Sequence, residues 1–170
     1  MLKTWGVVVG MLSMMGLVSA ADITEGMKAP AFEARDQSGA LVRLADFQGK
    51  ANVVLYFYPK DGTPGCTAEA CSLRDGFSAI QATGAVILGV SADTRESHRA
   101  FAGKYHLPFS LLADPDRTMI KAYGVRMPVL GWAKRVTFLI DRQGIVRKVI
   151  RDARTRDHDR QVLELLKALS

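Results

Sequence analysis

Cysteine is scarce in this chain of 170 residues, which contains only Cys66 and Cys71. Two cysteines are too few for a multi-disulfide scaffold or for a zinc site with four cysteine ligands. Six prolines and 15 glycines without a regular period exclude collagen and low-complexity classes. A hydrophobic content of 48% excludes an intrinsically disordered chain. The chain therefore has the length of one ordinary domain, and its cysteine chemistry is limited to a single pair.

Charge is absent between Trp5 and Val18, directly after the positive Lys3, and small residues follow at Ser19 and Ala20. This architecture predicts a secretory signal peptide over residues 1–20, cleaved after Ala20 or Ala21. The run is shorter than the roughly 20 apolar residues that span a bilayer, and an uncleaved membrane anchor is the alternative. We therefore expect residues 21–170 to form one exported domain in the bacterial periplasm, without stable membrane association.

The net charge of +6 raises the question of nucleic-acid binding. In the most basic stretch, residues 147–160, aspartates alternate with the arginines and no aromatic residue is present for base stacking. This pattern favours a solvated surface over a nucleic-acid interface, so we expect no nucleic-acid partner.

Apolar runs with the features of buried strands alternate with stretches of helical spacing. Alternation of this kind predicts an α/β sheet with crossovers, and the short turn near residue 143 predicts that the last two strands are antiparallel. The expected fold is thioredoxin-like: a mixed central sheet with helices on both faces and an extra N-terminal hairpin. The predicted elements are a hairpin over 31–44, strands over 52–58, 85–91, 109–112, 135–141 and 145–151, and helices over 67–82, 94–105, 115–123 and 157–169.

The stretch from Pro59 to Cys71 joins the end of a buried strand to the start of a helix, where α/β proteins place their sites. Thr63 suits the helix N-cap and Pro64 the first helical position. Cys66 then lies in the first turn, where free backbone N–H groups and the helix dipole favour a thiolate, the nucleophilic form of cysteine.

Cys71 follows Cys66 by five residues, which on an ideal helix separates their Cα atoms by roughly 8.6 Å. A disulfide needs less than about 7 Å, so the pair can bond only if the helix unwinds locally. From spacing alone, a static disulfide is the alternative, although so short a loop constrains the unfolded chain little. A metal site lacks ligands at zinc spacing. A cysteine–histidine hydrolase is not excluded by spacing, but nothing else supports it.

The string YPKDGTPGCTAEAC contains P-x-x-x-T-x-x-C, with Pro59, Thr63 and Cys66 at its fixed positions, and resembles the active-site signature of peroxiredoxins. The second cysteine five residues along resembles the peroxiredoxin Q subfamily (bacterioferritin comigratory protein). The resemblance covers residues 24–169 and includes AFEARDQSGALVRLADFQGK, SADTRESHRAFAGKYHLPFSLLAD, YGV and RVTFLIDRQG. It departs at Gly62, where the subfamily often has Asp, and over residues 125–134, which do not align securely.

The resemblance implies a role for each matching residue. Cys66 corresponds to the peroxidatic cysteine and Cys71 to the resolving cysteine. Thr63 corresponds to the threonine that orients the peroxide, Arg135 to the arginine that stabilises the thiolate and the developing charge, and Pro59 to the proline that shields the pocket.

Three other residues are candidates for a role at the site. We expect Glu69 to be a solvated helix residue rather than a supporting group. Arg126 is the nearest competitor for the role of Arg135, and Trp132 either contacts substrate or packs on the domain.

The implied activity is that of a thioredoxin-dependent peroxidase that reduces hydrogen peroxide and organic hydroperoxides through a cysteine sulfenic acid and an intramolecular disulfide. It requires a thioredoxin-like or glutaredoxin-like reductant and no metal or other cofactor. Resolution within one chain does not demand dimerisation, so we expect a monomer. The alternatives are an exported thioredoxin-like thiol-disulfide oxidoreductase that acts on proteins and a redox-inert module with a structural disulfide.

Overall fold

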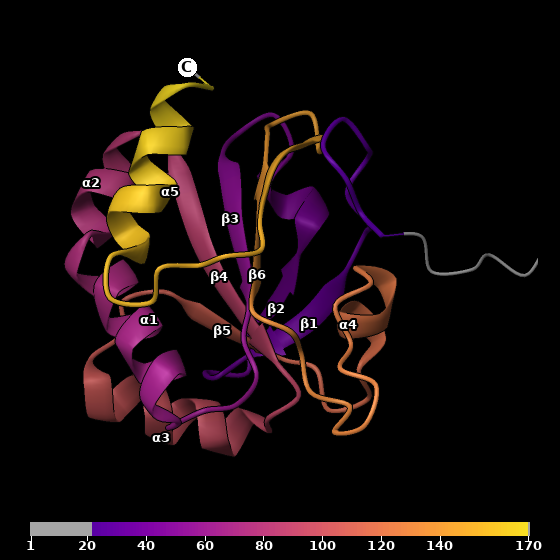
Figure 1. The fold of residues 1–170 in the computed structure, drawn as a ribbon, viewed down its shortest axis with the longest axis vertical. Helices are drawn as coiled ribbons and strands as arrows, with labels where there is room; N and C mark the ends of the chain where they lie inside the picture. Colours follow the sequence, from indigo (N-terminus) through magenta and orange to yellow (C-terminus); the bar gives the residue numbers. More distant parts are fainter. Residues whose placement is uncertain (1–21, 170) are drawn as a thin grey trace, which may run out of the picture.

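The computed structural model describes residues 22–169 (Figure 1). The predicted signal peptide over residues 1–20 lies outside the described residues. Within the described part, no helix is long and apolar enough to cross a membrane. In chain order the elements are β1 (Glu33–Asp36), β2 (Leu41–Arg43), the 3-10 helix η1 (Leu44–Phe47), β3 (Asn52–Phe57), α1 (Pro64–Asp75), α2 (Phe77–Ala82), β4 (Ala85–Ser91), α3 (Arg95–Tyr105), β5 (Ser110–Ala113), α4 (Thr118–Ala122), β6 (Val136–Ile140), β7 (Val146–Ile150) and α5 (His158–Lys167).

Seven strands form one mixed sheet in the order β2-β1-β5-β4-β3-β6-β7. The central strands β3, β4 and β5 are parallel neighbours. β6 is antiparallel to β3, and β7 is antiparallel to β6 because a short turn joins the two last strands. β1 and β2 form the N-terminal hairpin and extend the sheet beyond β5. The predicted thioredoxin-like fold, with its mixed sheet and extra hairpin, is confirmed.

Alternation along β3 divides the core between the two faces of the sheet. Val54 and Tyr56 belong to one hydrophobic cluster, and Val53, Leu55 and Phe57 belong to the other. The first cluster includes side chains of α1, α2, α3 and α5, and the second includes side chains of α4. Figure 1 shows α1, α2 and α5 together on one side of the sheet and α4 on the other. The sheet therefore carries helices on both faces, and the first turn of α1 follows the carboxyl end of the central strand β3.

The single helix predicted over residues 67–82 is two helices, α1 and α2, separated at Gly76. The break coincides with a tertiary contact that only glycine allows, because a Cβ atom at Gly76 would lie 2.5 Å from the Cβ of Asp159 near the start of α5. Ser72 Oγ donates a hydrogen bond to Asp159 Oδ1 at 2.7 Å and accepts one from the Asp159 amide at 3.1 Å. These bonds fix the end of α1 against the start of α5.

The helix predicted over residues 115–123 begins later, at Thr118, and is short. Arg117 occupies the left-handed region, with a φ of 60°, and so cannot continue a helix from the preceding residues. Asp114 lies just upstream, and its carboxylate accepts the Ile120 amide at 2.9 Å. The start of α4 is thus set by this turn and its acidic acceptor rather than by the proline at residue 115.

Candidate functional site

Cys66 is the third residue of α1, and its side chain is only 1% exposed. Thr63 occupies the N-cap position and Pro64 the first helical position, as the sequence predicts. The thiol therefore lies in the first turn of a helix of 12 residues, close to backbone N–H groups that lack helical partners. This placement confirms the location predicted for Cys66.

Arg135 reaches Cys66 from the neighbouring strand. β6 is antiparallel to β3, with Phe57 opposite Val136, so the residue before β6 lies beside the end of β3. Arg135 Nη2 donates a hydrogen bond to Cys66 Sγ at 3.4 Å. Arg126, the competing arginine, is exposed and forms an isolated bridge with Ala133 instead. The structure thus brings Arg135 and Cys66 together.

Glu69 is fully buried and forms an ion pair with Arg135 Nη1, so its prediction as a solvated helix residue is wrong. It follows Cys66 by three residues on α1 and therefore lies on the same helix face. Burial raises the pKa of Glu69 to about 7, although the charge and hydrogen bonds of Arg135 act in the opposite direction. Burial alone would lower the pKa of the Arg135 guanidinium. The neighbouring Glu69 and Cys66 outweigh this effect, so the pKa is raised.

His158 extends this group on the far side of Glu69. Its Nε2 lies 3.6 Å from Glu69 Oε1 and 2.8 Å from Thr137 Oγ1, and its side chain has no exposed surface. Sequence spacing gave no link between any histidine and the cysteines, because α5 reaches α1 only through the tertiary fold. Only the i, i+3 spacing of Cys66 and Glu69 carries a sequence signal for this part of the site.

Thr63 lies in the loop directly before Cys66, but its side chain does not cap α1. The hydroxyl donates to the Lys60 carbonyl at 3.0 Å, and the first turn closes through the Thr63 carbonyl, which accepts the Thr67 amide at 2.9 Å. The side-chain cap expected from the sequence is therefore wrong. Pro59 begins the same loop and is partly buried.

Cys71 lies on the same continuous helix as Cys66, is partly buried, and has a free thiol, as Cys66 does. The structure thus shows the reduced form of the pair with α1 intact. Trp132, from the loop before β6, lies under the Lys60 ammonium, whose Nζ is 5.4 Å from the ring centroid. It packs beside the loop that precedes Cys66.

A second polar cluster holds the loop before α1. Asp61 is almost buried, and its Oδ2 lies 2.8 Å from His98 Nδ1 and accepts the Ser97 hydroxyl at 2.7 Å. Its Oδ1 accepts the Tyr58 hydroxyl at 2.7 Å. Burial opposes the charge of Asp61, but these hydrogen bonds and His98 together hold the pKa of the carboxyl below its usual range. The loop is thereby fixed to α3.

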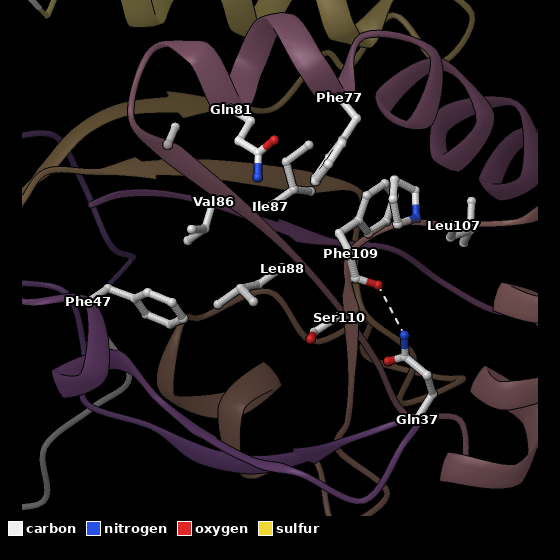
Figure 2. A pocket seen from close by; sticks show the side chains of 12 residues that line it. Gln37, Phe47, Phe77, Gln81, Val86, Ile87, Leu88, Leu107, Phe109 and Ser110 are labelled. Carbon is white, nitrogen blue, oxygen red and sulfur yellow. Dashed lines mark hydrogen bonds between the residues drawn. The ribbon is translucent and has the colours of Figure 1, made fainter. Parts of the chain in front are cut away.

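A cavity of about 450 Å³ lies along the first half of β4 and contains none of the predicted site residues (Figure 2). β5 begins to pair with β4 only at Leu88, which leaves the earlier part of β4 without a strand on that side. Phe47, Phe77 and Phe109 line the gap, and Gln37 Nε2 donates to the Phe109 carbonyl at 3.0 Å. The cavity therefore results from the stagger of the strands and is separate from Cys66.

The fold and the buried thiol place the chain among thioredoxin-fold enzymes that use cysteine as a nucleophile. The AhpC/TSA family model matches residues 26–149. Chloroplastic peroxiredoxin Q of Sedum lineare is 42% identical over 151 residues, covering 88% of this chain and 81% of that protein. Peroxiredoxin Bcp of Bacillus subtilis is also 42% identical over 151 residues, covering 85% of this chain and 96% of that protein.

Two solved structures extend the similarity to three dimensions. Peroxidoxin BcpB of Mycobacterium tuberculosis has a TM-score of 0.80 at 34% identity, covering 86% of this chain and 97% of that chain. The bacterioferritin comigratory protein of Xanthomonas campestris has a TM-score of 0.76 at 32% identity, covering 81% of this chain and 91% of that chain. The chain belongs to the AhpC/TSA family and, within it, to the peroxiredoxin Q/Bcp subfamily. It is a thiol-dependent peroxidase.

Proposed function

We propose that Cys66 is the peroxidatic cysteine of this peroxidase, Cys71 its resolving cysteine, and Arg135 the residue that stabilises charge on the reacting atoms. The observation that carries the proposal is the contact of 3.4 Å between Arg135 Nη2 and Cys66 Sγ in a buried first turn. A cation beside a thiol favours the thiolate, and the same donors stabilise charge that develops on a nearby oxygen.

The first step oxidises Cys66 and reduces the peroxide. The Cys66 thiolate attacks one oxygen of the O–O bond, which forms an S–O bond and breaks the O–O bond. The leaving oxygen takes the electron pair and a proton and departs as water or an alcohol, and Cys66 becomes a sulfenic acid. Arg135 and the Cys66 amide stabilise the charge that moves onto the leaving oxygen.

Thr63 and Pro59 shape the place where the peroxide binds. The Thr63 hydroxyl donates to the Lys60 carbonyl, which leaves its oxygen lone pairs to accept the hydroxyl hydrogen of a peroxide. Pro59 lies at the start of the same loop and is partly buried, which supports its role in shielding the reacting thiol from water.

In the second step, Cys71 sulfur attacks the sulfenic sulfur of Cys66, water leaves, and an intramolecular disulfide forms. The cysteines lie five residues apart on one helix, so α1 must open before their sulfurs can meet. A dithiol reductant of thioredoxin-like or glutaredoxin-like type then restores both thiols by exchange. Because both cysteines belong to one chain, the cycle is complete in a monomer.

The location proposed for this cycle is the bacterial periplasm, after removal of residues 1–20. The support is the sequence of that segment alone, with its charged start, uncharged run and small residues at the end. Mass spectrometry of the protein from separated cell fractions tests it. A mature form in the periplasmic fraction that begins at Ala21 or Asp22 supports export, and a full-length cytoplasmic form contradicts it.

The residue roles are tested by adding equimolar hydrogen peroxide to the reduced protein and counting thiols. We expect rapid loss of both thiols in the native protein, loss of one in Cys71→Ser, and no rapid loss in Cys66→Ser. The two serine variants are matched controls, since each removes one sulfur from the same helix. Rapid peroxide turnover by Cys66→Ser would overturn the assignment. Slow loss in the native protein would indicate a redox-inert module, and rapid insulin reduction a protein thiol-disulfide oxidoreductase.

A further inference from the structure

A buried carboxylate oxygen beside the reacting thiol has no hydrogen-bond partner. Glu69 and His158 both have side chains with no exposed surface, and Glu69 Oε2 is occupied by Arg135. Glu69 Oε1 is buried without a donor, although His158 Nε2 lies 3.6 Å away. An unpaired buried acceptor of this kind is costly, so its neighbours determine which protonation state it adopts.

Hydrogen bonds on the other side of the imidazole define its tautomer. His158 Nδ1 lies 2.9 Å from Gln161 Oε1, and the same oxygen accepts the Arg154 amide at 3.1 Å. Since Gln161 Oε1 is an acceptor in both contacts, Nδ1 carries a hydrogen. Nε2 therefore faces Glu69 and Thr137 with a lone pair in the neutral ring, and with a second N–H in the protonated ring.

One added proton can stabilise the buried Glu69 Oε1 from either of two positions. On Glu69 Oε1 it gives a neutral acid that faces His158. On His158 Nε2 it gives an N–H whose nearer acceptor is Thr137 Oγ1 at 2.8 Å, and a positive charge 3.6 Å from Glu69 Oε1. Burial raises the pKa of Glu69 to about 7 and lowers the pKa of His158, so both groups are more easily neutral here than in water. A neutral acid beside a neutral imidazole holds one proton between them.

We propose that Glu69 and His158 share one proton behind Arg135, and that His158 is a positioning residue that sets how much of the Arg135 charge acts on Cys66. This inference rests on the proposed role of Arg135. When the shared proton is present, the pair has no net charge, as an acid and a neutral imidazole or as a carboxylate and an imidazolium, so the Arg135 charge faces Cys66 without an uncompensated anion behind it. When the proton leaves, the Glu69 carboxylate compensates the guanidinium and weakens its effect on the peroxide.

Other charged or titratable groups also face this pair and enter its pH dependence. Arg135 contacts Glu69 directly, and both Arg135 and Arg154 disfavour a charged His158, whereas Asp159 favours it. Cys66 on α1 and the buried Tyr56 on β3 also lie close to this pair. Burial is the main reason that the pKa of the Tyr56 hydroxyl is well above its usual range. Because Tyr56 stays neutral, the pH dependence of this cluster near neutral pH is set by the pair itself.

The test compares the rate constant for peroxide reduction by the native protein, His158→Asn and His106→Asn across pH 5–9. Asparagine at residue 158 keeps a donor for Gln161 and removes Nε2, and His106 is an exposed histidine that serves as the matched control. Without Nε2 the proton is held less tightly, so the fall in rate on the alkaline side begins at lower pH. We expect His158→Asn to lose about threefold to tenfold at neutral pH and little at acidic pH, since a fall of about one unit in the pKa of Glu69 lowers its protonated fraction near pH 7 by that factor. His106→Asn should follow the native profile.

A second readout does not depend on activity. In ¹⁵N-histidine spectra of the reduced Cys66→Ser variant, His158 should show an Nδ1–H tautomer and a titration step that moves when Glu69→Gln is added. This measurement still tests proton sharing if Cys66 proves not to be the peroxidatic cysteine. The proposal is overturned by an Nε2–H tautomer, by a His158 step unaffected by Glu69→Gln, or by a His158→Asn rate that is unchanged or uniformly lowered at every pH.

Discussion

Oxidation of Cys66 and Cys71 to a disulfide is expected to destabilise the folded protein, although a cross-link usually stabilises one. Closing a loop of about six residues lowers the entropy of the unfolded chain by an amount worth about 2 kcal/mol. An intact helix, however, holds the two Cα atoms roughly 8.6 Å apart, beyond the limit of about 7 Å for a disulfide. The residues between them must leave the helix, and the folded state loses the contacts they make.

Two buried side chains and the backbone bonds of α1 contribute to that loss. Cys66 and Ala70 are each 1% exposed, and exposing both side chains costs about 2 kcal/mol. Unwinding the turns between the cysteines also removes at least two backbone hydrogen bonds of the helix, worth about 2 kcal/mol. The loss of about 4 kcal/mol exceeds the gain from the cross-link, so the oxidised protein should be less stable by about 2 kcal/mol.

Urea unfolding of the peroxide-oxidised and fully reduced proteins measures this difference directly. Cys71→Ser, treated with peroxide in the same way, is the control for effects of oxidation without a cross-link. We expect the oxidised native protein to unfold at a lower urea midpoint than the reduced one. An oxidised form that is more stable by about 2 kcal/mol would refute the reasoning, because it would mean that α1 accommodates the bond without losing its packing.

Three further predictions concern the residues around α1 and the sheet. The pKa of Glu69, raised by burial to about 7 in the folded state, lies above its usual 4.5, so its contribution to stability is full below pH 4.5 and is lost as pH rises through 7. Glu69→Gln should remove this pH dependence of the free energy of unfolding, which amounts to about 3 kcal/mol and is measured by urea unfolding at a series of pH values. The same dependence on pH in both proteins would contradict the prediction. Asp61→Asn should lower the free energy of unfolding by about 3 kcal/mol, since His98 and two hydroxyls lose a charged acceptor, and an unchanged midpoint would show that the cluster adds nothing. Gly89→Ala should cost about 1–3 kcal/mol in thermal unfolding, because its Cβ would lie 2.7 Å from Leu111 and 2.8 Å from Tyr56; a neutral effect would mean that these side chains move freely.

Local chemistry made the start of α1 predictable from the sequence. Thr63 and Pro64 suit the first positions of a helix, so the first-turn location of Cys66 follows from these two residues. The break at Gly76 could not be predicted in the same way, because it depends on Asp159, which arrives from a distant helix. The apolar spacing continues through the break, so periodicity alone predicts one helix.

The site shows the same division between local and tertiary information. The resemblance to a known motif singles out Arg135, and the antiparallel register of β3 and β6 explains how Arg135 comes to lie beside Cys66. Glu69 was misjudged because a glutamate on a helix usually faces water, and its burial depends on Arg135. His158 was missed because no spacing rule connects α5 to α1 across the sequence.

The two attachments on either side of the reacting helix limit where the chain can move during the redox cycle. Asp61 is fixed to His98 and, through its amide, to Asp93 at 2.9 Å, while Ser72 is fixed to Asp159. We therefore expect the rearrangement proposed to join the cysteines to be confined to residues 62–71, with the sheet unchanged. Segments this short open and close far faster than a domain unfolds. We therefore expect a local opening to precede formation of the proposed disulfide, and the face of the sheet under α4 to keep its shape when the cysteines are oxidised.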